Sequence, residues 1–538
     1  MTSPLQRLAK ISDKIILPSL LLVIGLSLGF SWMSPQVSAP NERTRIYLSL
    51  AMLERGELSI DKEIKTYGRV FDLSKKDGHF YTDKAPGSSF LAMPTIAAYK
   101  ALHHDKKTLS IEQLNNLVRH WVMIPFTLLT LALTFASMTL LNVRRKLRYQ
   151  LILALALGTP LFHYGAAFYG HALVLCFTMM SCWALLKTQI LRDTTLEEEA
   201  PNDPHHDKKI FALQALSSFA AAMCFFVEYQ GAIFCIAFAL AFLSVAKNRR
   251  IKPILAAAIG AAPPVLATLI YNTLAFGGPL TTSYQYLAHA SSVKAHNKGL
   301  FGIMLPTADS LYSLFLSPSR SLLFCAPIAL MGAVGCWWLW KKSRAVTLFA
   351  LFGIATATMI TLGFHVPFWG FGQRLMVPIL GVTTLAAATM LNVFDERKPL
   401  LSHALKGSLI TAMIYNVLVS TAFPEFPAEI TSPLHSVALH MINNDSVSTN
   451  LGGIYIASRS AQGLLPLYLF TLISALFLLL PNFKKLHVRS LVAPLISVSF
   501  ALLLAAALWY APEDRAPKKL AKWQNWAMNL RWDATAHK

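Results

Sequence analysis

Apolar residues gather along the chain in runs close to the roughly 20 residues that a helix needs to cross a bilayer. Short segments rich in Lys and Arg separate many of these runs. Such segments are typical of the cytoplasmic loops of multi-pass membrane proteins. The pattern predicts an all-α polytopic fold with about 13 transmembrane helices. The predicted spans are residues 15–33, 121–141, 151–167, 169–186, 210–227, 230–246, 252–274, 322–340, 345–363, 374–393, 402–422, 464–481 and 489–511.

The positions of the basic segments predict how the chain is oriented. Arg7, Lys10 and Lys14 precede the first span, which we interpret as an uncleaved helix with a cytoplasmic N-terminus. A signal peptide is the alternative, because Val37-Ser38-Ala39 resembles a cleavage site. With an odd number of spans the C-terminus lies outside. The predicted outer segments are residues 35–119, 275–321, 423–463 and 512–538.

The organisation follows from these spans. It comprises a cytoplasmic N-terminus with the first helix (1–34), a periplasmic loop (35–119), a helical membrane domain (120–511) and a periplasmic tail (512–538). The apolar stretch 88–102 is too short to span, so we place it on the outer surface as an interfacial or re-entrant helix. The large, charged first loop indicates that the chemistry takes place on the outer face.

Composition excludes several classes of protein. The chain has 538 residues with a net charge of +21, and 54% of them are hydrophobic. Only 14% are charged, against about 25% in a soluble domain, and the mean hydropathy is +0.48. A soluble enzyme and a disordered chain are therefore excluded. Basic loops explain the charge, so no nucleic-acid partner is expected. The six Cys form no Cys-x-x-Cys pair and suggest neither disulfides nor a zinc site.

Carboxylates of the first loop are the candidates for acid–base chemistry. Glu42 lies near the start of a predicted helix that ends at Gly56. It either complements the helix dipole or acts as a general base facing a cavity at the membrane surface. Asp61 and Asp72 are further candidates for the base, and both also fit solvated loop positions.

Several cations are placed where a phosphate group could bind. Lys84 lies in an Asp-Lys-Ala-Pro-Gly turn before the interfacial helix, and it either binds phosphate or extends to lipid headgroups. Arg320 and Arg374 stand at the outer ends of predicted spans, where arginines clamp phosphate or anchor the helix. His365 and Trp369 are candidates for stacking on a sugar, although an aromatic belt explains Trp369 equally well.

Two polar residues at span ends have simpler explanations. His171 begins an inward-going span, where it either lines a cavity or is a hydrogen-bonded core histidine. Glu228 ends an outward-going span, and its position at the membrane interface accounts for it.

The order of motifs in the first loop resembles that of GT-C class membrane glycosyltransferases. The greatest similarity is to the bacterial clan of protein O-mannosyltransferases and aminoarabinose transferases. The motifs that carry the resemblance are Asn41-Glu42, Met52-Leu53-Glu54-Arg55-Gly56 and Tyr81-Thr82-Asp83-Lys84-Ala85-Pro86. Later pieces are also similar, namely Phe276-Gly277-Gly278-Pro279-Leu280 with Tyr284, Leu316-Ser317-Pro318-Ser319-Arg320, and Trp369-Gly370-Phe371-Gly372-Gln373-Arg374. The chain departs from the clan at Asn41, where the clan carries its catalytic Asp.

The resemblance implies an inverting glycosyltransferase of the bacterial inner membrane. Its donor would be a sugar on a polyprenyl phosphate, with membrane lipid as a further partner and an acceptor of unknown identity. It implies Glu42 as base, with Asp61 and Asp72 as alternatives. It also implies a substrate site that includes Arg45, Tyr81, Lys84, Tyr284, Arg320, His365 and Arg374. A requirement for a divalent metal stays open.

Two other functions are carried as alternatives. A lipid-linked oligosaccharide flippase or transporter would show charges inside its spans and repeat symmetry, and both are scarce here. A polymerase or ligase of surface polysaccharide would share the outward site but place its long loop elsewhere. The chain has no Gly-x-x-x-x-Gly-Lys-Ser/Thr phosphate loop, which agrees with a lipid-linked rather than a nucleotide donor.

Overall fold

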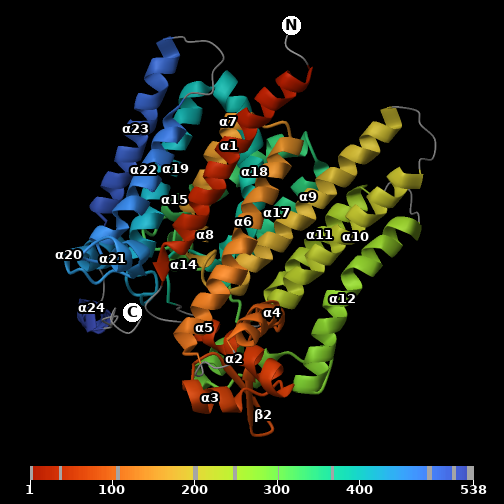
Figure 1. Cartoon of the computed structure of the whole chain (residues 1–538), viewed down its shortest axis with the longest axis vertical. Helices are drawn as coiled ribbons and strands as arrows, with labels where there is room; N and C mark the ends of the chain where they lie inside the picture. Colours follow the sequence, from red (N-terminus) through yellow and green to blue (C-terminus); the bar gives the residue numbers. More distant parts are fainter. Residues whose placement is uncertain are drawn as a thin grey trace.

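The protein is a bundle of long apolar helices with a unit of short helices and one hairpin at one end (Figure 1). The computed structural model describes residues 4–34, 39–103, 109–197, 204–245, 251–300, 302–364, 369–480, 488–511 and 517–529. The main helices of the bundle are α1 (Pro4–Ser31), α5 (Ile111–Val118), η1 (Arg119–Met123), α6 (Ile124–Leu140), α9 (Gly170–Glu197), α10 (Pro204–Val227), α11 (Ala232–Val245), α12 (Ile251–Phe276), α16 (Pro327–Trp340), α17 (Arg344–Gly363), α18 (Leu380–Arg397), α19 (Pro399–Ala422), α22 (Leu465–Leu479) and α23 (Val488–Trp509).

Within the described ranges, nine helices are long and apolar enough to cross a membrane, and three shorter apolar helices accompany them. The protein is therefore a multi-pass membrane protein of mainly helical fold. The structure does not confirm the predicted count of 13. The predicted span 151–167 is broken into α7 (Arg145–Leu157) and α8 (Leu161–Tyr164). Pro160 lies at the break and has no amide hydrogen with which to continue the helix.

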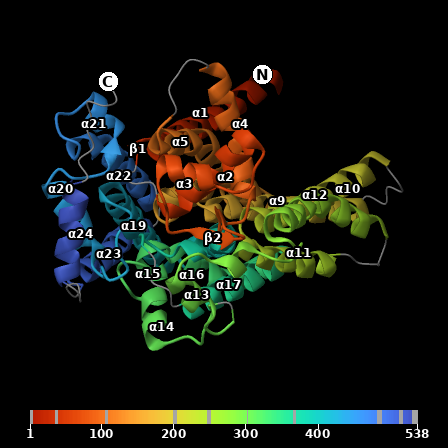
Figure 2. The same ribbon diagram turned by 90° about the horizontal axis from the view of Figure 1, so that it is seen from below.

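The segments predicted to lie outside gather at one end of the bundle, the lower end in Figure 1. Figure 2 views the molecule from that end and shows the first loop, α13 (Ala290–His296), α14 (Ala308–Phe315), α20 (His440–Asn443), α21 (Leu451–Tyr455) and α24 (Pro517–Asn529) together. We call it the cap end. The start of α1 lies at the opposite end, as do the end of α9 and the start of α10.

The first-loop unit (residues 39–103) forms the centre of the cap end. Its elements are α2 (Pro40–Arg55), α3 (Asp61–Tyr67), β2 (Leu73–Lys76), β3 (His79–Thr82) and α4 (Gly87–Leu102). The expected end of α2 is confirmed, because Gly56 takes the left-handed conformation with φ +67° and its amide hydrogen-bonds to Ala51 and Met52. The short helix expected at 88–102 is confirmed as α4.

The hairpin of β2 and β3 corrects the all-α expectation. Asp77 and Gly78 both have positive φ, 49° and 87°, as the two central residues of a type I′ turn require. A second pair of short strands, β1 (Met33–Ser34) and β4 (Thr449–Asn450), joins the end of α1 to a later outer segment. The apolar alternation of such short strands is too brief to stand out from the sequence.

Later outer segments pack on the first-loop unit. The Ala288 amide donates to the Leu73 carbonyl at 2.9 Å, and the Ser283 hydroxyl donates to the Asp83 carbonyl at 2.8 Å. Gly87 begins α4 against the backbone of Phe226, where a Cβ atom would collide. Glycine there lets α4 approach the end of α10, so the first-loop unit is fixed directly over the ends of the long helices.

Candidate functional site

Five charged residues meet where the first-loop unit covers the ends of α10 and η2 (Tyr229–Gly231). Lys84 Nζ lies 3.1 Å from a carboxylate oxygen of Asp72 and 3.1 Å from one of Asp83. Arg45 pairs with Glu228 at 2.8 Å, and both side chains are buried. The charges of Glu228 and Arg45 also act on Lys84, so the Lys84 group and the Arg45–Glu228 pair lie close to each other. We call these five residues the charged cluster.

Local structure fixes each member of the cluster. Arg45 stands one helical turn after Asn41 on α2, and its Nε donates to the Asn41 side chain at 3.0 Å. Its Nη1 donates to the Ser88 hydroxyl on α4 at 2.8 Å. Asp72 precedes β2, and Asp83 and Lys84 follow β3, so the hairpin brings them together. Gly170 leaves room for the Arg45–Glu228 pair, since a Cβ there would overlap the Glu228 carboxylate.

The carboxylates of the cluster differ in how completely they are paired and hydrogen-bonded. It holds three carboxylates and two cations. Burial raises the pKa of Asp83 against the attraction of Lys84. Asp83 Oδ1 is buried and has no hydrogen-bond partner among the described residues. Burial opposes the ionised form of Glu228, but the attraction of Arg45 outweighs it and lowers the pKa of that carboxyl. Asp83 is thus the carboxylate best placed to take up a proton.

A pocket adjoins the cluster at Glu228. Glu228, His171 and Gln230 supply its polar lining, while Phe234 and Ile360 are among its apolar residues. The apolar side comes from α11 and α17, which are helices of the bundle. A ligand with a charged head and an apolar chain would fit this division of polarity.

A second group of polar residues surrounds Glu425. Its Oε1 accepts a hydrogen bond from the Tyr169 hydroxyl at 3.2 Å and lies 3.2 Å from His163 Nε2. The Arg374 guanidinium lies 5.8 Å from the centre of the Tyr169 ring. Arg374 also interacts electrostatically with both Asp72 and Glu425, so it connects this group to the charged cluster.

Two motifs from distant parts of the chain dock beside Glu425. Gly370 has φ +115° and donates its amide to the Phe426 carbonyl at 2.9 Å. Gly372 has φ +71° and donates to the Ser319 carbonyl at 3.0 Å. These positive φ values are ones that glycine adopts at little cost. Arg320 is buried nearby, in a tightly packed region that Gln373 also lines.

Glu42 is bonded to backbone amides on both sides. Its two oxygens accept from Ala39 and from Phe168, each at 2.9 Å. It thereby caps α2 and ties the first-loop unit to the segment before α9. Burial raises the pKa of Glu42, and the positive charge of Arg119 opposes this rise. Its role as a base stays a prediction, with neither oxygen free of a backbone donor.

The other predicted residues are distributed around the site. Lys84, Arg45 and Asp72 belong to the charged cluster, and the Tyr284 ring lies 5.6 Å from that of Tyr229, the residue after Glu228. Asp61 instead holds the hairpin, accepting from the Phe80 amide at 2.9 Å and lying 2.7 Å from His79 Nδ1. The Tyr81 ring contacts that of Phe276 at 5.5 Å. His365 lies outside the described residues, and Trp369 packs against Trp526 at 5.9 Å.

Three residues of the site are not among the site residues predicted from the sequence. Asp83 stands inside a quoted motif, and its place before Lys84 was the available signal. Glu228 was explained by its interface position, yet it pairs with Arg45. Glu425, in a Phe-Pro-Glu-Phe stretch after a span, gave no signal beyond being an acid near a helix end. Across the part of the chain that the structure describes, no three His, Cys, Asp or Glu side chains are grouped as metal ligands would be.

Comparisons with known proteins give only remote structural similarity. No family model and no curated protein matches the sequence. The archaeal oligosaccharyltransferase AglB from Archaeoglobus fulgidus, solved with an inhibitory peptide and a dolichol-phosphate, aligns with a TM-score of 0.48 and 11% identity. That alignment covers 77% of this chain and 56% of AglB, so the chain spans little more than half the length of that protein.

ArnT from Cupriavidus metallidurans aligns in two states. Bound to undecaprenyl phosphate it gives a TM-score of 0.44 and 10% identity, over 92% of this chain and 79% of ArnT. The apo state gives 0.44 and 12%, over 93% and 79%. Both proteins are GT-C glycosyltransferases, the class that the sequence resembles. TM-scores below 0.5 describe a broadly similar course of the chain and assign no residue or activity to it.

Proposed function

We propose that the protein is a membrane glycosyltransferase that moves a sugar from a polyprenyl-phosphate donor to an acceptor hydroxyl, with inversion at the sugar C1. The observation that carries the proposal is the charged cluster, in which a buried carboxylate with an unpartnered oxygen lies beside a half-buried lysine. Transfer to a hydroxyl needs a base for the acceptor proton and cations for the departing phosphate. The cluster and its surroundings contain both.

The proposed base is Asp83, in preference to Glu42. Both Glu42 oxygens are occupied by backbone amides, whereas Asp83 Oδ1 is unoccupied by any described donor. In the proposed step the acceptor oxygen attacks C1, and its proton passes to the carboxylate. The bond between C1 and the phosphate oxygen breaks, and that oxygen keeps the electron pair.

Lys84 and Arg374 are the proposed cations for the leaving phosphate. Arg374 begins η4 (Arg374–Ile379), which contributes Leu375 and Pro378 to the pocket beside Glu228. The apolar lining of that pocket would receive the first isoprene units of the donor.

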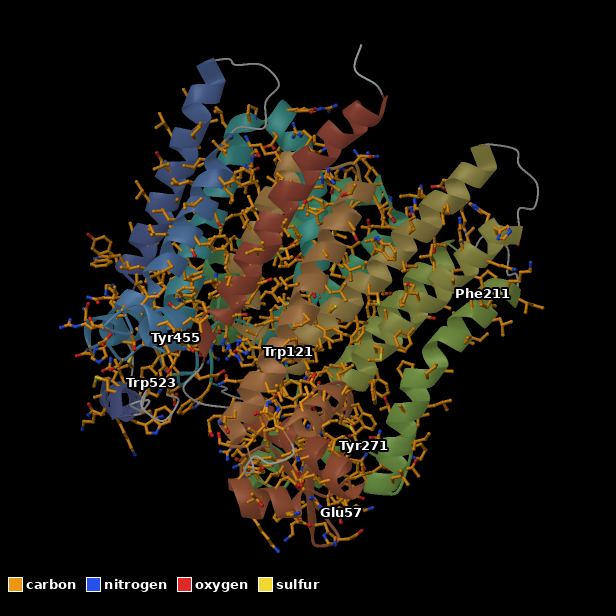
Figure 3. The ribbon with its side chains drawn as sticks, viewed as in Figure 1. Glu57, Trp121, Phe211, Tyr271, Tyr455 and Trp523 are labelled. Atoms are coloured by element: carbon orange, nitrogen blue, oxygen red, sulfur yellow. The ribbon has the colours of Figure 1, made fainter. Side chains whose placement is uncertain are left out.

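The proposed location is the bacterial inner membrane, with the cap end in the periplasm and the N-terminus in the cytoplasm. Glu57 and Glu396 are exposed and suit a test of this orientation. Glu57, labelled in Figure 3, lies in the first-loop unit. A cysteine at position 57 is expected to react with an impermeant thiol reagent in spheroplasts, and one at position 396 is not. The reverse pattern would contradict a periplasmic site.

The function itself is tested by mass analysis of lipid A, glycans and cell-surface proteins from cells with and without the gene. We expect one sugar modification to disappear without the gene and to return with the wild-type gene but not with Asp83→Asn. A purified protein that releases polyprenyl phosphate from the matching donor only when the acceptor is present would establish transfer. Donor that moves across the bilayer with no bond broken would support the transporter alternative instead.

A further inference from the structure

A further pocket lies beside the short β1–β4 pair, and none of its lining residues belongs to the charged cluster. Five elements contribute to it: the end of α1, β1, η1, α8 and the end of α19. Its lining is divided between apolar and polar side chains. The apolar side includes Phe30, Met33 and Phe162, and the polar side includes Arg119, His163 and Ser420.

Arg119 is the only arginine or lysine in the lining of this pocket within the described ranges. Its side chain is buried, with the residue 2% exposed, and its Nη2 donates to the Met33 carbonyl at 3.0 Å. Its Nε and Nη1 have no hydrogen-bond partner in the described part of the chain, and neither has the Ser420 hydroxyl. Buried donors of this kind are costly unless something accepts from them.

The neighbouring acids do not supply the missing acceptors. Glu42 attracts Arg119 electrostatically, but its two oxygens accept from backbone amides. His163 lies against Glu425, which also takes the Tyr169 hydroxyl. The protein therefore balances part of the charge of Arg119 while leaving two of its nitrogens unbonded.

The local backbone and the level in the membrane agree with a binding role. Arg119 begins the π-helical turn η1, and such turns inside α-helices are frequent at functional sites. Trp121 in the same turn is 70% exposed and lies just above the first-loop unit in Figure 3. Trp side chains are enriched at the membrane–water interface. Phe30, Met33 and Phe162 provide apolar lining at this level.

We propose that this pocket binds the phosphate group of an amphipathic ligand, with Arg119 and Ser420 donating to the phosphate oxygens. An arginine suits an oxyanion because its guanidinium presents several donors in a fixed plane. The apolar lining favours a phosphate that carries an acyl or isoprenoid chain. The site uses none of the residues of the charged cluster, and the proposal does not rest on the proposed glycosyl transfer.

Binding is measured on the full-length protein in detergent, by native mass spectrometry across a concentration series. The probes are dioctanoyl phosphatidic acid, dioctanoylglycerol as the same lipid without phosphate, and inorganic phosphate as a competitor. Arg119→Met is compared with Arg148→Met, a matched control whose Nε is also unpartnered among the described residues but which lies on α7. Loss of one hydrogen bond to a charged group weakens binding by about ten- to a hundredfold.

The expected result is that phosphatidic acid binds at least tenfold more weakly to Arg119→Met and unchanged to Arg148→Met, while dioctanoylglycerol binds poorly to all. Displacement by inorganic phosphate would identify phosphate alone as sufficient, and failure to displace would identify the lipid headgroup as the ligand. Equal binding to Arg119→Met and wild type, or to the two lipids, would overturn the proposal. If Arg119→Met does not fold, Ser420→Leu fills the pocket and keeps Arg119. Unchanged binding to that variant would also overturn it.

Discussion

Two ionic groups, one near each end of the bundle, differ in how completely their buried carboxylates are hydrogen-bonded and ion-paired. Away from the cap end, Asp395 accepts from Lys406 at 2.8 Å, accepts from Ser402, and pairs with Arg144 at 3.3 Å. The Asp395 and Lys406 side chains are each only 1% exposed. In the charged cluster, three carboxylates share two cations, and Asp83 keeps one buried oxygen without a described partner.

The difference separates a structural network from a candidate site. A buried ion pair with its hydrogen bonds complete fixes the packing of helices, and removing one partner leaves an uncompensated charge. A buried carboxylate with an open oxygen and a raised pKa has capacity left for a substrate proton. Asp83 and Asp395 are both buried, so burial alone would not have distinguished the two groups. The number of hydrogen bonds and ion pairs at each carboxylate does distinguish them.

The largest effect is expected at the open carboxylate. Asp83→Asn keeps the size of the side chain but removes the base, and we expect kcat to fall by about 10²–10⁴-fold. Kinetics with the donor and acceptor measure this. Asp61→Asn is the matched control, because Asp61 bonds the hairpin and not the cluster. If Asp61→Asn loses as much as Asp83→Asn, the comparison between site and scaffold fails.

The pH dependence of the same reaction sharpens this test. A base must be ionised, so activity is lost as pH falls through its pKa, and burial raises the pKa of Asp83. The acidic limb of kcat/KM is therefore expected above the value of about 3.9 for an ordinary aspartate. The residual activity of Asp83→Asn should lack that limb. A limb that persists in this variant would assign the base elsewhere, with Glu42 as the next candidate because burial also raises its pKa.

At the satisfied network the expected loss is of stability. Lys406→Ala leaves Asp395 with one cation fewer in a buried position, which costs about 3–5 kcal/mol of unfolding free energy. Thermal unfolding in detergent measures the change. Lys398→Ala, at an exposed position between α18 and α19, should change stability by less than about 0.5 kcal/mol. Equal stability of the two variants would show that the buried pair contributes no more than a surface lysine.

A smaller effect is expected at the cation of the cluster. Lys84→Ala removes a charge-assisted hydrogen bond to the proposed leaving phosphate, lowering turnover by about ten- to a hundredfold and raising KM for the donor. It also leaves Asp72 and Asp83 without their shared cation. Lys84→Arg keeps the charge and should recover part of the activity. Unchanged kinetics in Lys84→Ala would reduce this lysine to an anchor of the hairpin.

The smallest effect is expected at Glu42. Glu42→Gln replaces one acceptor oxygen with an amide donor that faces a backbone N–H, so the cap of α2 weakens by about 0.5–2 kcal/mol. The unfolding temperature should fall while kcat of the folded enzyme changes little. A normal unfolding temperature with a loss of kcat of about 10²-fold or more would restore Glu42 as the base.

Much of the architecture could be read from local pattern. Apolar runs located most of the long helices, and Gly56 marked the end of α2. The interruption at Pro160 and the Asp77-Gly78 hairpin were missed because each occupies only a few residues within a longer signal. Lys84, Arg45 and Asp72 were found by motif and by residue type, and the structure brings them to one place.

The sequence alone determined which segments are helical, which are apolar enough to span, and which loops carry charge, since these depend on neighbours within a few residues. Only the tertiary structure decided which charges meet. Arg45 pairs with a glutamate 183 positions further along the chain, and Glu425 lies against a histidine 262 positions before it. Such pairs form because helix ends from distant spans converge at the cap end, where close packing decides which carboxylate receives a partner and which keeps an open oxygen.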